Sequence, residues 1–144
     1  MTKKQSNVLE CCLFFTANSL ARAITKMGEE EFVSVGMTPS YAFLLTLVNT
    51  SPGISQKELA SGLHIAPSTV SRFVDTLRGK GYLTKNIEGR SAFIFPTDAG
   101  RSLQADIEKV WHSLYERYSK ILGREHGEML TGLTASASRK LSQG

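Results

Sequence analysis

The sequence predicts a mainly helical fold with one small β-hairpin. Apolar residues recur at helical spacing along most of the chain, which indicates amphipathic helices. Only residues 82–95 combine aromatic and β-branched residues with a central turn, at 88–90, and this pattern is typical of a hairpin. We therefore expect four helices, then the hairpin, then two further helices. A length of 144 residues with 41% hydrophobic residues agrees with a single domain spanning 1–144.

A helix, a tight turn and a second helix are predicted between residues 55 and 79. Ser55, followed three positions later by Glu58, forms a capping box that begins the first helix at Gln56. Pro67 begins the second helix, because proline at the first helical position gives up an amide that would have no partner there. A helix-turn-helix of this kind places its second helix in the major groove of DNA.

The second helix of this motif has two different faces. One face is apolar at the spacing that buries a helix, with Val70, Phe73, Val74 and Leu77. The other face carries small hydroxyl side chains and one arginine, in Ser68, Thr69, Ser71 and Arg72. Small side chains allow close approach to base edges, and arginine can pair with guanine through two hydrogen bonds. This face therefore predicts base contacts, and the alternative is an ordinary solvated polar face.

The hairpin follows directly after this helix. Gly79 and Gly81 are expected to end the helix, since glycine takes the left-handed conformation without steric cost. Strands are predicted over 82–87 and 91–95, and Glu88-Gly89-Arg90 forms the turn between them. Arg90 at or beside the tip is placed to contact phosphates or the minor groove. A solvated loop arginine is the equally ordinary alternative.

The stretch SQKELASGLHIAPSTVSRFVDTLRGKGYL, followed by the hairpin and TDAGRSL, resembles the MarR family of bacterial transcriptional regulators. The resemblance covers roughly residues 36–105 and implies a winged helix-turn-helix lobe at 38–97. Two departures stand out. The wing, 86–91, is short, with only Arg90 in the place of the family's wing arginine. Ala66 is a poor N-cap for the second helix.

The resemblance implies a sequence-specific regulator of transcription, acting as a repressor on double-stranded DNA. Residues 55–101 hold seven Lys or Arg and four Asp or Glu, so +3 of the net charge of +4 lies there, as expected for binding to a phosphate backbone. The expected DNA-binding residues are Ser55 and Gln56 at the backbone, Pro67, Ser68, Thr69, Ser71 and Arg72 on the second helix, and Arg90 in the wing. The alternative function is a winged-helix module for protein contact without specific DNA binding.

The two ends of the chain are predicted to form a dimer interface. Residues 6–27 are apolar over more than half of a helix circumference, which requires burial on two sides. A long helix is expected after Thr97, with Gly123 and Gly127 breaking or bending it before a last, weaker helix. The resemblance implies that 6–35 and 98–142 pair in a two-fold homodimer, which would favour a pseudo-palindromic operator.

Cys11 and Cys12 have two interpretations. Their position before an apolar run resembles the branch of the family that senses organic hydroperoxides, which makes Cys12 and Cys11 candidate redox-sensing residues. No tyrosine precedes Tyr41, although that branch uses tyrosines near its reactive cysteine. On the expected helix, adjacent side chains point about 100° apart, so the two thiols would not share one environment. The alternative is that both are small buried hydrophobes.

Other chemistry-bearing residues give weaker signals. Trp111 and Tyr115 are candidates for a small-molecule effector pocket, although aromatic residues at helical spacing are more often core. His64, His112 and His126 lack the spacing of a zinc site. We expect no metal, no cofactor and no enzymatic activity, because the sequence shows no nucleophile–base pair or phosphate loop. A cytoplasmic location and the absence of membrane contact are also expected, since Glu10 and Asn18 interrupt the short N-terminal apolar run.

Overall fold

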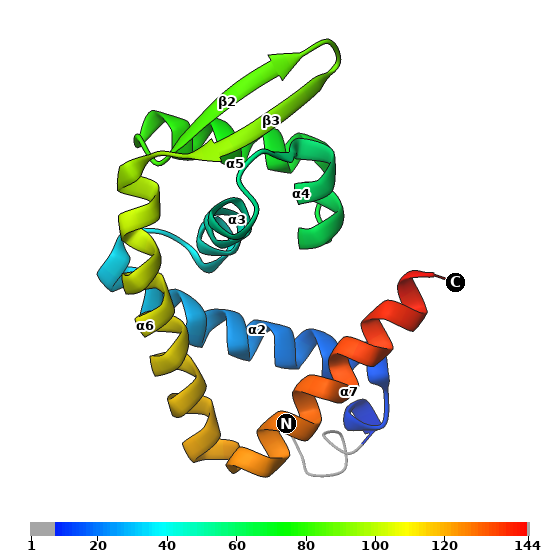
Figure 1. The fold of residues 1–144 in the computed structure, drawn as a ribbon. Helices are drawn as coiled ribbons and strands as arrows, with labels where there is room; N and C mark the ends of the chain where they lie inside the picture. The colour runs from blue at the N-terminus through cyan, green and yellow to red at the C-terminus, as the bar shows by residue number, and fades with distance from the viewer. Residues whose placement is uncertain (1–7, 144) are drawn as a thin grey trace. The chain divides into compact units, whose positions relative to one another are not determined.

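The computed structural model describes residues 8–143, and it confirms the predicted class of a mainly helical chain with a small β-wing. Its elements follow one another along the chain (Figure 1): α2 (Leu13–Phe32), the short 3-10 helix η1 (Val33–Val35), α3 (Pro39–Thr50), β1 (Ile54–Ser55), α4 (Gln56–Leu63), α5 (Pro67–Gly79), β2 (Leu83–Glu88), β3 (Ser91–Pro96), α6 (Asp98–Leu122) and α7 (Arg124–Ser142). The chain forms two compact units, of which the first ends at Glu108 and the second begins at Lys109.

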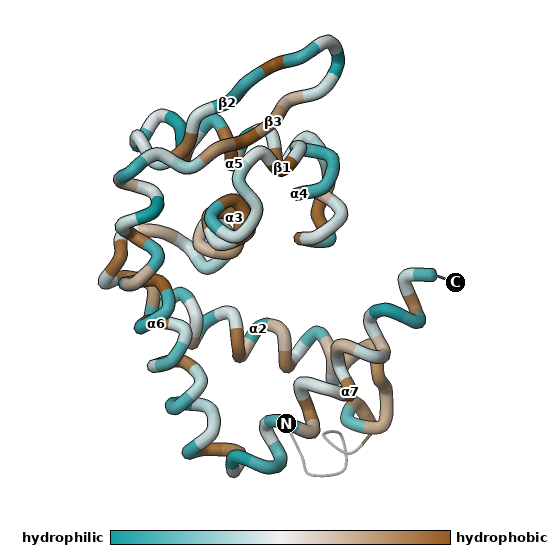
Figure 2. Tube along the Cα trace, viewed as in Figure 1, coloured by the Kyte–Doolittle hydropathy of each residue, from teal (hydrophilic) through white to brown (hydrophobic). Residues whose placement is uncertain are grey.

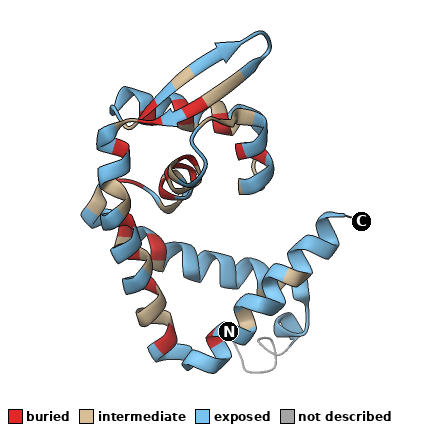
Figure 3. Cartoon of the chain, viewed as in Figure 1, coloured by how far each residue is buried: buried red, intermediate tan, exposed pale blue. Residues whose placement is uncertain are grey.

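The core of the first unit is built around α3. Leu44, Leu45 and Val48 of this helix are completely buried, and Figure 3 shows buried positions gathered on α3. α2, α4, α5, β3 and α6 each contribute at least one completely buried side chain to the core, and β2 contributes a nearly buried one: Phe32, Leu59, Val70, Val74, Ile94 and Ile107 are 0% exposed, and Leu77 and Leu83 are nearly so. The hydrophobic burial of these side chains is what holds α4, α5 and the hairpin together.

The sheet has three antiparallel strands in the order β1-β3-β2. Strand β1 pairs with β3 through Ile54 opposite Ile94 and Ser55 opposite Phe93. The sequence did not predict β1, because two residues are too few to show an alternating pattern and its partner lies about forty positions away. The hairpin itself was predicted to within one residue at each end.

The N-terminal helix differs from its prediction over 6–27, of which residues 6 and 7 lie outside the described part of the chain. Residues 8–10 are helical, Cys11 lies in a turn, and α2 begins only at Leu13. Cys12 has the extended backbone of an N-cap, and its amide donates to the Leu9 carbonyl at 3.0 Å. The apolar periodicity of the sequence continues across this break, which is why one continuous helix was predicted. Cysteine, which occupies both positions of the break, is a weak helix former. At its other end α2 extends to Phe32.

Part of α6 and the whole of α7 make the second unit. Gly123, with φ +88°, ends α6, as predicted. Gly127 does not break the chain, because it lies inside α7 and is buried. Tyr115 donates a hydrogen bond to Glu128 at 3.0 Å and lies 5.4 Å from the guanidinium of Arg124. These contacts join the end of α6 to the start of α7.

Many apolar side chains remain exposed on α2 and α7, where Figure 2 shows apolar positions along both helices. The exposed set includes Val8, Leu13 and Phe14 before and at the start of α2, and Met129, Leu133 and Leu141 on α7. In the described part of the chain, no single helix is long and apolar enough to span a membrane. The bent pair Leu13–Val35 and Pro39–Thr50, at 66° to each other, meets the length and composition criteria only when joined, and α3 in that pair is a buried core helix.

Candidate nucleic-acid interface

Helix α4 begins at the predicted capping box. The Ser55 hydroxyl accepts from the backbone N–H of Glu58 at 3.1 Å and donates to the Glu58 carboxylate at 3.0 Å. The first bond satisfies a backbone N–H that a helix N-terminus leaves open, and the second joins the two side chains of the box. The Ser55 hydroxyl, expected at the DNA backbone, is thus already engaged within the chain. Gln56, the other expected backbone contact, is half-buried, and its side-chain oxygen lies buried.

The turn between α4 and α5 is closed by backbone geometry. His64 adopts the left-handed conformation, with φ +57°, and its amide donates to the Ala60 carbonyl. Helix α4 therefore runs through Gly62 and ends one residue later, at Leu63. Helix α5 begins as predicted, with Ala66 as N-cap and Pro67 as first residue. Ala66 makes no side-chain capping bond, in agreement with the weak cap expected from its residue type.

The two faces of α5 separate as the sequence predicts. Val70, Val74 and Leu77 are buried, while Phe73 is half-buried with its ring 4.4 Å from that of Tyr41. On the polar side, Pro67, Ser68 and Arg72 are exposed, and Thr69 and Ser71, which flank this stripe, are half-buried. Because the apolar face is fixed in the core, the opposite face is held outward with one arginine and several short side chains.

Asp75, which was not among the predicted DNA-binding residues, lies on the same outward stripe. This residue follows Arg72 by three positions and Ser68 by seven, so all three share one side of the helix. Its side chain is 58% exposed, with the carboxylate 3.5 Å from Arg78 and 4.0 Å from Lys85 of β2. A carboxylate at this place can accept from the exocyclic amine of cytosine. Helical spacing alone would have revealed it.

The end of α5 leads directly into the wing. The Gly81 amide donates to the Arg78 carbonyl at 2.9 Å, and the Tyr82 amide donates to the Leu77 carbonyl at 3.0 Å. With Gly81 at φ +83°, this is a Schellman cap. Gly81 therefore fills the predicted role, whereas Gly79 is the last helical residue.

The wing is a short, exposed hairpin. Glu88 pairs with Ser91, so Gly89 and Arg90 alone form the turn, with Gly89 at φ +60°. Arg90 is exposed at the tip, where the sequence placed it, and Figure 1 shows the hairpin extending away from the helices. Ile87, on β2 near the tip, is 65% exposed. The wing therefore offers one positive charge and one apolar side chain to a partner.

Within the first unit, the fold brings together most of the predicted DNA-binding residues. Arg72 and its neighbours lie on α5, Ser55 and Gln56 lie at the start of α4, and Arg90 lies at the tip of the hairpin that α5 leads into. The α4–α5 pair is a helix-turn-helix, and the β2–β3 hairpin is its wing. The arrangement presents a helix for a DNA groove and a hairpin for neighbouring backbone.

The other candidate residues lie outside this lobe. Cys11 and Cys12 are both exposed, so neither is a buried core residue of the single chain, and neither lies inside a helix. Trp111 and Tyr115 are half-buried on α6. Burial raises the pKa of Tyr118, whose ring packs edge-on against Tyr115 at 5.5 Å. Among the described residues, no three His, Cys, Asp or Glu side chains are grouped to hold a metal ion.

Comparison with known proteins agrees with this geometry. The family model described as "MarR family" matches residues 37–88. The chain is 26% identical over 87 residues to the uncharacterized HTH-type transcriptional regulator YybA of Bacillus subtilis (strain 168), and the alignment spans 58% of each protein. The chain thus covers little more than half the length of that relative.

Solved structures share the fold over nearly the whole chain. The transcriptional repressor CouR bound to a 23-mer DNA duplex superimposes with a TM-score of 0.83 at 24% identity, over 90% of this chain and 94% of the other. CouR bound to p-coumaroyl-CoA gives the same TM-score at 23% identity, over 91% and 94%. The S. aureus MepR–DNA complex gives 0.78 at 15% identity, over 90% and 98%.

A helix-turn-helix with an outward arginine-bearing face and a basic wing tip defines the class of winged helix-turn-helix transcriptional regulators. Within that class, residues 37–88 are similar to the MarR family, whose model matches them.

Proposed function

We propose that this protein is a homodimeric, sequence-specific DNA-binding regulator, acting as a repressor that a signal releases from a pseudo-palindromic operator. The observation that carries the proposal is the outward face of α5, where exposed Ser68 and Arg72 lie opposite buried Val70 and Val74. Because one face of α5 is buried in the core, its opposite face stays accessible to the base edges of DNA. Two similar structures, the CouR complex with a 23-mer DNA duplex and the S. aureus MepR–DNA complex, support the same proposal.

The test begins with a duplex selected from randomised sequence by the wild-type chain. We expect this duplex to remain bound in the presence of competitor DNA and to dissociate steeply as salt rises. Arg72→Ala removes a bidentate base contact, so the affinity should fall about 10-fold to 100-fold and one position of sequence preference should relax. Arg139→Ala, in the last turn of α7, removes the same charge away from α5 and should leave the sequence preference unchanged.

Two outcomes would contradict the proposal. If Arg72→Ala kept the full affinity and preference of the wild type, α5 would not be the reading helix. If the wild type bound all duplexes equally and only at low salt, the alternative of a winged-helix module for protein contact would be the better account.

The homodimer is proposed because both ends of the chain carry exposed apolar side chains. Phe14 is 79% exposed at the start of α2, and Leu133 and Leu141 are 66% and 71% exposed on α7. Burying such side chains gains about 1.5–3 kcal/mol each when complete, and a second copy of the chain would supply the same surfaces. A two-fold dimer would present two copies of α5 to successive major grooves and so favour a pseudo-palindrome.

The signal is proposed to enter either through cysteine oxidation or through a small molecule near Trp111 and Tyr115. The p-coumaroyl-CoA named in one CouR structure indicates an aromatic thioester as the first compound to test. Trp111 is the only tryptophan in the chain, so its fluorescence reports directly on this part of α6. We expect p-coumaroyl-CoA to change the fluorescence and release DNA, and coenzyme A alone to do neither. Release without any fluorescence change would place the site elsewhere.

A further inference from the structure

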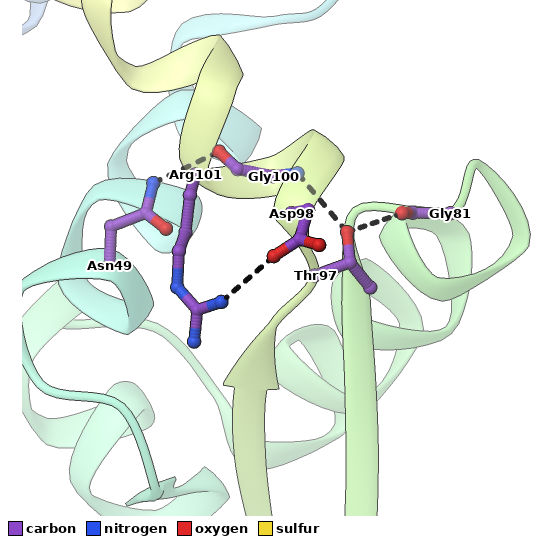
Figure 4. A network of polar contacts seen from close by, with 6 residues as sticks. All are labelled: Asn49, Gly81, Thr97, Asp98, Gly100 and Arg101. Atoms are coloured by element: carbon purple, nitrogen blue, oxygen red, sulfur yellow. Dashed lines mark hydrogen bonds and ion pairs between the residues drawn. The ribbon is translucent and has the colours of Figure 1, made fainter.

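We propose that Thr97 is a positioning residue that fixes the end of the DNA-reading helix α5 and the start of the wing to the first turn of α6. This inference rests on the proposed function for its effect on DNA binding. The joint itself lies wholly within the first compact unit, and Figure 4 shows its polar contacts.

One hydroxyl makes two bonds in opposite directions. Thr97 Oγ1 donates to the Gly81 carbonyl at 2.6 Å and accepts from the Gly100 amide at 3.1 Å. The first bond reaches the Schellman cap of α5, and the second is the N-cap of α6. The Thr97 amide also donates to the Tyr82 carbonyl at 3.0 Å. Thr97 therefore ties the cap of one helix to the cap of the other.

The approach of α6 to this cap is close enough to exclude a side chain. A Cβ on Gly100 would clash with the Tyr82 carbonyl oxygen, so only glycine fits at this position while the joint keeps its geometry. The next part of α6 is held to α3, because the Asn49 side-chain amide donates to the Gly100 carbonyl at 3.2 Å and to Gln104 at 2.9 Å. The first turns of α6 thus have polar contacts with the α5 cap and with α3.

The Thr97 contacts hold the helix that carries the reading face. Ser68 and Arg72 sit on a helix whose C-terminal cap is bonded to Thr97, and the wing strand β2 starts two residues after Gly81. A rotation of the first turn of α6 would therefore move both α5 and the wing. The Thr97 hydroxyl is the side-chain group that couples these movements. A merely structural N-cap would stabilise α6 without affecting the cap of α5.

The test compares Thr97→Val, which keeps the shape but removes both hydroxyl bonds, with Thr97→Ser, which keeps the hydroxyl. Thr50→Val is the matched control, since among the described residues the Thr50 hydroxyl bonds only to the Thr46 carbonyl of its own helix, at 2.8 Å. The first measurement is amide hydrogen exchange without DNA. Thr97→Val should speed exchange at Gly81 and Tyr82 as well as in the first turn of α6, whereas Thr97→Ser and Thr50→Val should leave Gly81 and Tyr82 unchanged.

The second measurement is affinity for the duplex selected by the wild type. Thr97→Val should bind this duplex about tenfold more weakly. The variant lacks one to two net hydrogen bonds that hold the reading face in place, and their free energy corresponds to a factor of this size. Thr97→Ser should restore most of the affinity. Faster exchange confined to α6 would reduce Thr97 to an N-cap and overturn the inference. Failure of the wild type to select any duplex would instead overturn the proposed function, and the exchange result would still decide the joint.

Discussion

Gly100 occupies a point where the backbone of α6 meets the carbonyl of Tyr82 without room for a methyl group. The sequence shows only a glycine in the first turn of an amphipathic helix, where alanine would be the better helix former. Its selection is explained by a contact with a residue eighteen positions earlier. By contrast, the role of Ser55 followed from its neighbours alone, because a capping box is a local pattern.

Gly100→Ala should therefore destabilise the first unit. Overpacking against backbone costs about 1–3 kcal/mol of unfolding free energy, measurable by urea denaturation. Gly79→Ala is the control, because a Cβ there meets nothing within 4 Å and the residue has no positive φ. It should leave stability unchanged or raise it by up to about 1 kcal/mol. Equal effects of the two substitutions would mean that the Gly100 contact does not limit packing.

At the scale of elements, the helices with strong apolar periodicity and local end signals were predicted well. Helices α4 and α5 begin where Ser55 and Pro67 indicate, and the hairpin forms where β-branched residues flank Gly89. Two features were not predictable. The break at Cys11–Cys12 interrupts a continuous apolar pattern, and β1 exists only because Ile54 finds Ile94 across the folded lobe.

Arg90 at the tip of the wing is expected to contact one DNA phosphate. With a two-residue turn, Arg90 is the only basic residue at its tip, so Arg90→Ala should weaken binding by a similar factor for all duplexes. The slope of log affinity against log salt should fall by about 1, as expected for one phosphate contact. Binding isotherms at several salt concentrations measure this. A change in sequence preference without a change in slope would indicate that Arg90 reads the minor groove instead.

For the whole molecule, the exposed apolar side chains at both chain ends are the feature that a single chain leaves unexplained. Large exposed apolar side chains gathered on one helix often mark an interaction site. The described fold satisfies the core of the first unit without them, since Val8, Leu13 and Phe14 remain exposed.

Phe14→Glu should shift the protein from dimer toward monomer, because burying an unpaired carboxylate in an apolar interface is costly. Sedimentation velocity over a range of concentrations measures the change. Ile87→Glu is the matched control, with a similar exposure of 65% but a position on the wing strand β2, outside the predicted dimer segments 6–35 and 98–142, and it should leave the dimer intact. A wild type that sediments as a monomer at all concentrations would contradict the proposed dimer.

Oxidation of the exposed cysteines is expected to weaken DNA binding. An organic hydroperoxide can reach thiols that are exposed in the chain, and oxidation would add polar groups beside Leu13 and Phe14. We expect oxidant to weaken duplex binding by the wild type and expect Cys12→Ser to be insensitive, with Cys11→Ser separating the two thiols. If the wild type binds equally well with and without oxidant, small-molecule sensing becomes the preferred signal.

The helix-turn-helix, the polar face of α5 and the position of Arg90 could be predicted from the sequence, because capping, periodicity and turn chemistry act between residues close in the chain. The third strand, the need for glycine at position 100, the linkage through Thr97 and the ion pair of Asp75 with Lys85 of β2 became visible only in the folded structure. These depend on which distant backbone groups meet, and that is fixed only when the buried side chains of α3, α5 and β3 have packed into one core.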